Sequence, residues 1–114
     1  MKKTTYMYPY VGQGRASIAI RYTPKFDGDQ EAEMSVAFCA PGDQFCRRDG
    51  RNLVNERLLS GKYVVLPIAK GAHIKQAAVD LLKEMLKSNL APSWTRKHVG
   101  TVGDDECSSC YIGR

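Results

Sequence analysis

The stretch ASIAIRYTPKFDGDQEAEMSVAF, residues 16–38, decides the fold. From Ile18 to Tyr22, apolar side chains alternate with polar or small ones, as a strand buried on one face requires. The same alternation returns from Glu33 to Phe38, and Asp27-Gly28 between the two segments is typical of a turn. The stretch therefore predicts an antiparallel hairpin with a charged, exposed tip.

A helix is expected directly after this hairpin. Pro41-Gly42 ends the second strand, and Asp43 is suited to cap a helix at about residues 44–59. Gly50 inside this segment costs about 1 kcal/mol of helix stability relative to alanine. Close packing against the sheet would offset that cost, so we expect the helix to approach the sheet at Gly50.

Two further elements follow. Residues 63–68, YVVLPI, form a short apolar run rich in β-branched side chains, which predicts a strand with Pro67 at a sheet edge. Residues 72–89 repeat apolar side chains at intervals of three and four, which predicts an amphipathic helix. A short helical turn is expected at residues 93–95, after Pro92.

The element order β-β-α-β-α predicts an α+β fold, a small antiparallel or mixed sheet with the two helices packed on one face. A chain of 114 residues is long enough for one modest core. We expect a single domain at residues 16–98, preceded by an irregular arm or edge strand at residues 1–15. Residues 99–114 are expected to be a polar tail with a C-x-x-C motif.

The composition favours an acidic partner. Seventeen Lys and Arg against twelve Asp and Glu give a formal net charge of +5 and a pI of about 9.1. This excess favours nucleic acid, an anionic surface or an acidic protein face. No apolar run reaches the roughly 18 residues of a transmembrane helix, and no signal-peptide pattern follows Met1. We therefore expect a soluble cytoplasmic protein that does not bind membranes.

The four cysteines leave two alternatives open. Cys39 and Cys46 are separated by six residues, and Cys107 and Cys110 form a C-x-x-C. Four thiolates would suit tetrahedral zinc, with His98 as a further candidate ligand, but one half of the site would lack the usual tight knuckle. The alternative is that Cys39 and Cys46 are small core residues, and we expect no cofactor. No paired-carboxylate, Ser-His-Asp or Cys-His pattern stands at a recognisable spacing, so we do not expect an enzyme.

Basic and aromatic side chains form the main candidate site. Arginines near a helix N-terminus suit phosphate recognition, because backbone N–H groups and the helix dipole add to their charge. Tyrosines at alternate positions of the N-terminal segment suit stacking on bases or anchoring of a protein interface. The candidate binding residues are Arg47, Arg48, Arg51, Arg57, Arg96, Lys97, Tyr8 and Tyr10. The alternative is that these are ordinary solvated helix faces with aromatic rings packed on the sheet.

Residues 36–61, VAFCAPGDQFCRRDGRNLVNERLLSG, resemble a pattern in small, uncharacterised proteins of tailed phages and related mobile elements. The pattern is a strand followed by Ser/Cys-x-x-Asp-x-Phe-x-Arg, then Gly-Arg and a downstream Arg-Leu. The matching positions are Phe38, Asp43, Phe45, Arg47, Gly50, Arg51, Arg57 and Leu58. The resemblance covers about a quarter of the chain and implies a phage or prophage accessory protein that acts in the host cytoplasm.

Two functions follow as hypotheses. The first is a small accessory protein that binds nucleic acid through its arginine-rich helix. The second is an inhibitor or modulator of a host enzyme or defence complex, of the anti-CRISPR kind, that uses the same basic patch against a protein that processes nucleic acid. An open sheet edge and the tyrosines leave a homodimer open in either case.

Overall fold

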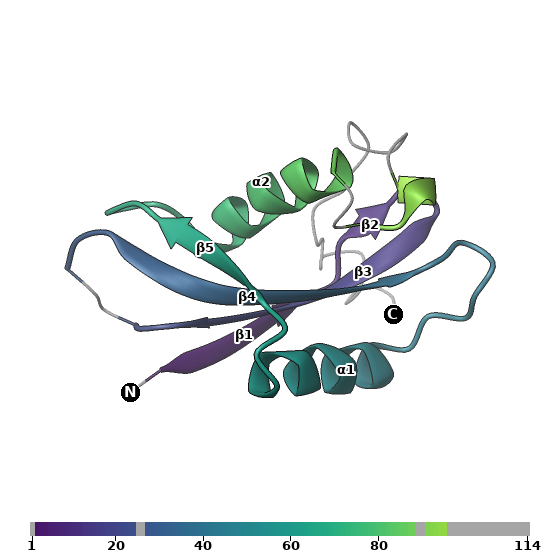
Figure 1. Ribbon diagram of the computed structural model, residues 1–114, viewed down its shortest axis with the longest axis horizontal. Coiled ribbons are helices and arrows are strands. Elements are labelled where there is room, and N and C mark those ends of the chain that lie inside the picture. Colours follow the sequence, from purple (N-terminus) through teal and green to yellow (C-terminus); the bar gives the residue numbers. More distant parts are fainter. Residues whose placement is uncertain (1, 25–26, 89–90, 96–114) are drawn as a thin grey trace, which may run out of the picture.

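The structure is a computed structural model that describes residues 2–24, 27–88 and 91–95. It has a five-stranded antiparallel sheet and two helices, which confirms the α+β class (Figure 1). The strand order is β1-β3-β4-β5, and β2 also pairs with β3. The elements are β1 (Lys3–Met7), β2 (Tyr10–Val11), β3 (Gly14–Tyr22), β4 (Gln30–Cys39), α1 (Arg47–Leu59), β5 (Val64–Ile68) and α2 (Ile74–Leu86).

The predicted hairpin is the centre of the sheet. Strands β3 and β4 pair antiparallel from Arg15↔Cys39 to Arg21↔Glu33, and the turn contains Gly28 with a φ of 124°. β5 then pairs with the first half of β4, as an edge strand that accommodates Pro67. The alternation of side chains between the two faces of a strand thus produced the expected pairing.

The N-terminal segment is an edge strand, which is one of the two alternatives left open for residues 1–15. β1 and β2 pair with β3 in one continuous register, Met7↔Ile18 and Tyr10↔Arg15. A turn at Gly12-Gln13 closes this hairpin, and Gly12 has a φ of 61°, a backbone conformation that glycine adopts at little cost. The register places Tyr6, Tyr8 and Tyr10 on one face of the sheet.

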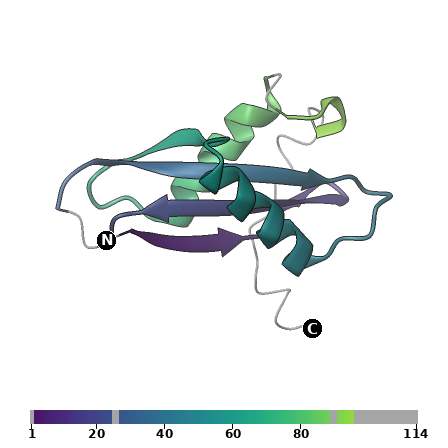
Figure 2. The same ribbon diagram turned by 60° about the horizontal axis from the view of Figure 1, so that its bottom comes forward.

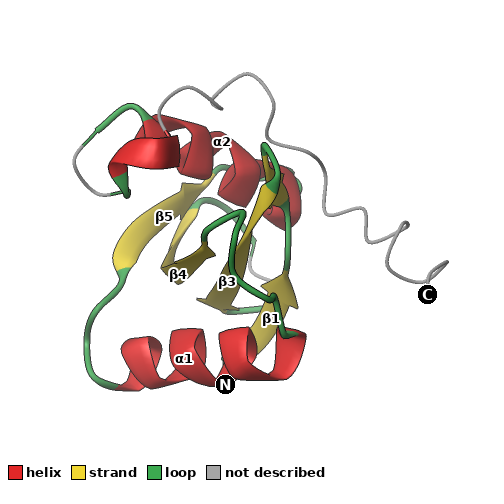
Figure 3. Ribbon diagram, turned by 90° about the vertical axis from the view of Figure 1, so that its right-hand side faces the viewer, coloured by secondary structure: helices red, strands yellow, loops and turns green. Residues whose placement is uncertain are grey.

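The prediction that both helices pack on one face is wrong. Helix α2 lies on one face of the sheet and α1 on the other, as Figures 1 and 3 show. Buried Ile, Met, Val and Leu side chains form the larger core under α2, whereas Ala19 and Ala37 meet Val54 and Leu58 under α1. The small Ala and Ser side chains of β3 and β4 indicated a solvated face, but they are buried because a helix covers them closely.

The predicted cap of α1 is also wrong. The helix begins at Arg47 rather than Gln44, and its N-cap is Cys46, whose side chain makes no capping hydrogen bond. Cys46 is extended, with φ −133° and ψ 119°. The preceding Phe45 packs at 6.1 Å, centroid to centroid, from the Tyr8 ring. Residues 44–46 lie outside the helix, so Asp43 lies too far upstream to cap it.

The remaining elements agree with the sequence patterns. α2 packs Ala78, Leu82 and Leu86 into the larger core. A single helical turn at residues 93–95 places the Trp94 ring against Gly14 and edge-on to Phe38. In the described part of the chain, no helix is long and apolar enough to cross a membrane.

Candidate functional site

Helix α1 lies unusually close to the sheet, and this closeness builds the candidate site. A Cβ atom placed on Gly50 would lie 2.0 Å from the Ser17 hydroxyl oxygen, so only glycine fits there without a shift. The buried Ser35 hydroxyl donates a hydrogen bond of 2.6 Å to the carbonyl oxygen of Val54 in the helix. These contacts confirm the expectation for Gly50 and hold α1 beside the tyrosines of β1 and β2.

Arginine and aromatic side chains interleave in the angle between α1 and the β1–β2 edge. Figure 2 shows the backbone of these elements from the α1 side. The Arg15 Cζ atom lies 4.0 Å from the centroid of the Tyr10 ring and 4.5 Å from that of Phe45. Arg47 Cζ lies 4.9 Å from the Tyr8 centroid. We call this set the arginine–aromatic seam; its members are Tyr6, Tyr8, Tyr10, Arg15, Phe45, Arg47 and Arg51.

The arginines of the seam differ in how firmly they are held. Arg15 is half-buried, and its Nη2 and Nε atoms donate hydrogen bonds of 2.8 and 3.2 Å to the Tyr8 carbonyl oxygen. Arg47 and Arg51 are exposed, and the Arg51 Cζ atom lies 5.8 Å from the Tyr6 centroid. Arg15 therefore orders the seam, while Arg47 and Arg51 present guanidinium groups to solvent over tyrosine rings.

The exposed arginines of α1 have no carboxylate within ion-pair distance among residues 2–24, 27–88 and 91–95. By contrast, Arg21 on the same sheet face pairs with Glu33, and this hydrogen bond holds the pKa of Glu33 below its usual value. Asp49 in the first turn of α1 is exposed and makes no ion pair within the described ranges. The positive charge of Arg47, Arg48 and Arg51 thus stays available to an external anion.

The structure separates the other predicted binding residues from this seam. The half-buried Arg57 donates a hydrogen bond through Nη1 to the Val36 carbonyl oxygen, at a part of β4 that β5 does not reach. This contact satisfies an edge carbonyl, so we leave Arg57 out of the candidate site. Arg96 and Lys97 lie outside the described residues, and their assignment stays a prediction.

Sequence reasoning gave Arg15 no role, and it did not select Tyr6 or Phe45 as binding residues. A signal for Arg15 was present, because a two-residue turn at Gly12-Gln13 places Arg15 opposite Tyr10. Tyr6 follows from the same alternation that indicated Tyr8 and Tyr10. Phe45 was one of the pattern positions in residues 36–61, but its contacts with Tyr8 and Arg15 join two distant segments and have no local signal.

The zinc prediction is not tested. Cys39 and Cys46 line one hollow between the start of α1 and the end of β4, and both are free thiols. Cys107, Cys110 and His98 lie outside the described residues. Within the described part of the chain, no three His, Cys, Asp or Glu side chains are grouped to hold a metal ion.

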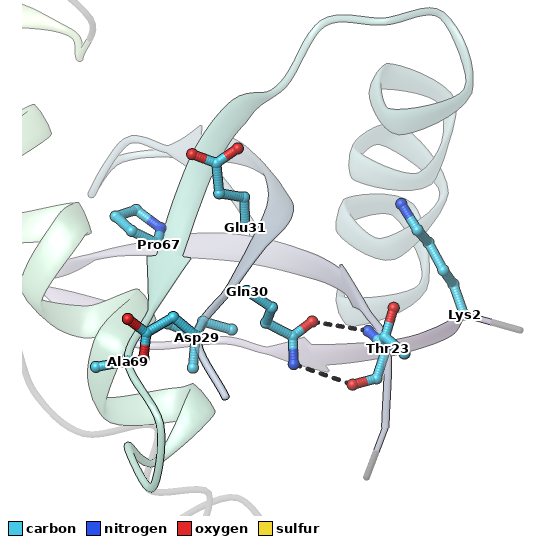
Figure 4. Close-up of a pocket in the computed structure, with 8 residues that line it drawn as sticks. Lys2, Thr23, Asp29, Gln30, Glu31, Pro67 and Ala69 are labelled. Carbon is cyan, nitrogen blue, oxygen red and sulfur yellow. Dashed lines mark hydrogen bonds between the residues drawn. The ribbon is translucent and has the colours of Figure 1, made fainter. Parts of the chain in front are cut away.

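A second hollow lies at the other end of the sheet, where β3, β4 and β5 meet (Figure 4). Three of its polar residues, Thr23, Gln30 and Asp29, make internal hydrogen bonds. The Gln30 amide accepts from the Thr23 N–H and donates to the Thr23 carbonyl oxygen, both at 3.0 Å. The Asp29 carboxylate accepts from the Lys70 backbone N–H at 2.7 Å. These bonds fasten β3, β4 and the end of β5 together, and we assign this hollow no ligand.

Comparisons with protein-family models, with curated proteins and with solved structures gave no match to this chain. The resemblance to phage accessory proteins therefore stays a prediction, and the functional argument depends on the seam.

Proposed function

We propose that this protein binds nucleic acid through the arginine–aromatic seam and the adjoining start of α1. The observation that carries the proposal is the pairing of exposed guanidinium groups with tyrosine rings in place of carboxylates, at Arg47 over Tyr8 and Arg51 over Tyr6. A net charge of +5 adds a general attraction for a polyanion.

Contact with a tyrosine ring favours binding of phosphate by an arginine side chain. A guanidinium group held over a ring, where no carboxylate takes up its N–H groups, keeps those groups available for bidentate hydrogen bonds to phosphate oxygens. The ring also limits side-chain motion, so less conformational entropy is lost when Arg47 or Arg51 binds.

The N-terminus of α1 supports the same anion preference. Its first backbone N–H groups have no partner within the helix, and the Cys46 side chain does not cap them. These groups and the helix dipole favour an anion beside Arg47 and Arg48. Phosphate contacts of this kind fix position without reading sequence, so the proposed binding is largely independent of base sequence.

The test is a salt titration of affinity for nucleic acid, with the variant R47A/R51A. Each lost phosphate contact should lower the slope of log K against log[salt] by roughly 0.7 to 0.9, so the double variant should lose about 1.5. The control is K75A/K87A, which removes two exposed positive charges from α2 and its C-cap on the opposite face and should change the affinity by less than about threefold.

An affinity that is flat between low and moderate salt would contradict the proposal. So would a protein partner that is retained in stoichiometric amount after nuclease treatment, if the purified protein binds no oligonucleotide. That result would favour the inhibitor hypothesis.

A further inference from the structure

We infer that the ligand of the seam is an unpaired nucleotide strand rather than a duplex, with its backbone along α1 and a base against Tyr10. This inference rests on the proposed function and adds the class of nucleic acid.

The first step concerns the outward face of α1. Gly50, Val54 and Leu58 face the sheet, so the helical period places Asp49, Asn52 and Glu56 on the far side. A helix that reads a duplex enters the major groove with its outward side chains. Two carboxylates on that face of α1, against the one guanidinium group of Arg48 at its border, would meet the phosphates that flank the groove, which opposes such docking.

The second step concerns the place of the positive charge. Arg47 and Arg51 lie on the flank of α1 that faces β1, since their guanidinium groups contact the Tyr8 and Tyr6 rings. The two residues are four positions apart, just over one helical turn, or about 6 Å along the axis. A narrow row of charge in the angle between a helix and an edge strand suits one backbone better than the two backbones of a duplex.

The third step concerns the aromatic rings. Proteins that bind single strands combine a basic track for the backbone with rings on which bases stack. Tyr10 is 37% exposed, whereas Tyr6 and Tyr8 are half-buried under arginines. Arg15 fixes the Tyr10 ring from one side by a contact of 4.0 Å to its centroid. The Tyr10 ring is therefore ordered by Arg15 and still exposed, so a base can stack on it at the end of the row of arginines.

The experiment compares fluorescence anisotropy of labelled oligothymidylate, oligouridylate and a DNA hairpin with the same number of phosphates. We expect at least one of the single strands to bind tenfold or more tightly than the hairpin. The ratio of the affinities for oligothymidylate and oligouridylate shows whether the protein prefers DNA or RNA.

Three variants test the stacking step. Y10A should weaken single-strand binding about tenfold, whereas Y10F keeps the ring and should bind as the unmodified protein does. The matched control is Y63A, because Tyr63 has the same 37% exposure but lies outside the seam. Thermal unfolding of each variant separates loss of binding from loss of fold.

Hairpin binding as tight as strand binding, with a salt slope that falls in R47A/R51A, would overturn this inference and leave the proposed function standing. Absence of binding to all three probes would overturn both. Unchanged strand binding by a folded Y10A protein would overturn the placement of a base on Tyr10.

Discussion

The two faces of the sheet are built from side chains of different size and have different roles in the structure. The face under α2 carries large apolar side chains such as Ile18, Ile20 and Met34, fully buried with Leu82 and Leu86. The face under α1 carries Ser17, Ala19, Ser35 and Ala37, all buried but small.

The two faces therefore differ in their roles: one stabilises the fold, and the other positions helix α1. Large side chains bury the apolar area that stabilises the fold. Small side chains contribute little area, but they let α1 approach until its flank meets the tyrosines of β1 and β2. The α2 face therefore holds the molecule together, and the α1 face determines where the arginines lie.

The largest expected decrease in the free energy of unfolding comes from a substitution in the core under α2. Leu82 is fully buried in the larger core, so L82A should lower the free energy of unfolding by about 2 to 5 kcal/mol. Urea denaturation measures this change. As a control, L59A removes a side chain that is 74% exposed and should change stability by less than about 0.5 kcal/mol. Equal effects of the two variants would remove the distinction between core and surface leucines.

A smaller loss is expected when α1 is forced away from the sheet. G50A gains helix propensity but places a methyl group against Ser17, and overpacking of this kind costs about 1 to 3 kcal/mol. The double variant S17A/G50A should recover part of the loss, which a double-mutant cycle in urea would detect. G42A is the control, because no atom lies within 4 Å of its added Cβ. Stabilisation by G50A alone would show that the close approach is not required.

Loss of the hydrogen bond from sheet to helix should cost less. S35A removes the donor to the Val54 carbonyl oxygen, and we expect a decrease of about 1 kcal/mol in the free energy of unfolding. S60A is a suitable comparison, because the exposed Ser60 hydroxyl donates only to carbonyl oxygens of its own helix. If S60A costs as much as S35A under the same conditions, the bond does not fasten the helix to the sheet.

The smallest expected change in the free energy of unfolding comes from protonation of Glu33, which forms an ion pair with Arg21, at low pH. The folded state lowers the pKa of Glu33 through its hydrogen bond with Arg21, while the unfolded chain has a value near 4.5. The pair therefore stabilises the fold above pH 4.5, and this contribution is lost as the pH falls through the lowered pKa. Urea midpoints at pH 7 and pH 3 should differ less in E33Q than in the unmodified protein. An identical pH dependence in both would exclude this pair as its source.

Elements with a clear local period were predictable. The alternation of residues 16–38 predicted β3 and β4, and the three- and four-residue intervals of residues 72–89 predicted α2. Gly50 indicated close packing because a glycine inside a helix has a known cost. The start of α1 was not predictable from Asp43, because residues 44–46 lie outside the helix and Phe45 packs against Tyr8, a distant residue between β1 and β2.

The sequence by itself determined β3, β4, β5, α2, the hairpin of β3 and β4, and the excess of positive charge, since these depend on side chains near one another in the chain. Only the tertiary structure decided that the helices pack on opposite faces of the sheet. In the sequence, Ala and Ser side chains that a helix will bury alternate along a strand in the same way as Ala and Ser side chains that face solvent. The tertiary structure also decided which arginines meet aromatic rings and which meet a carboxylate or a carbonyl oxygen. That choice depends on the register of β1 against β3 and on the depth at which Gly50 lets α1 pack, and both are contacts between distant segments.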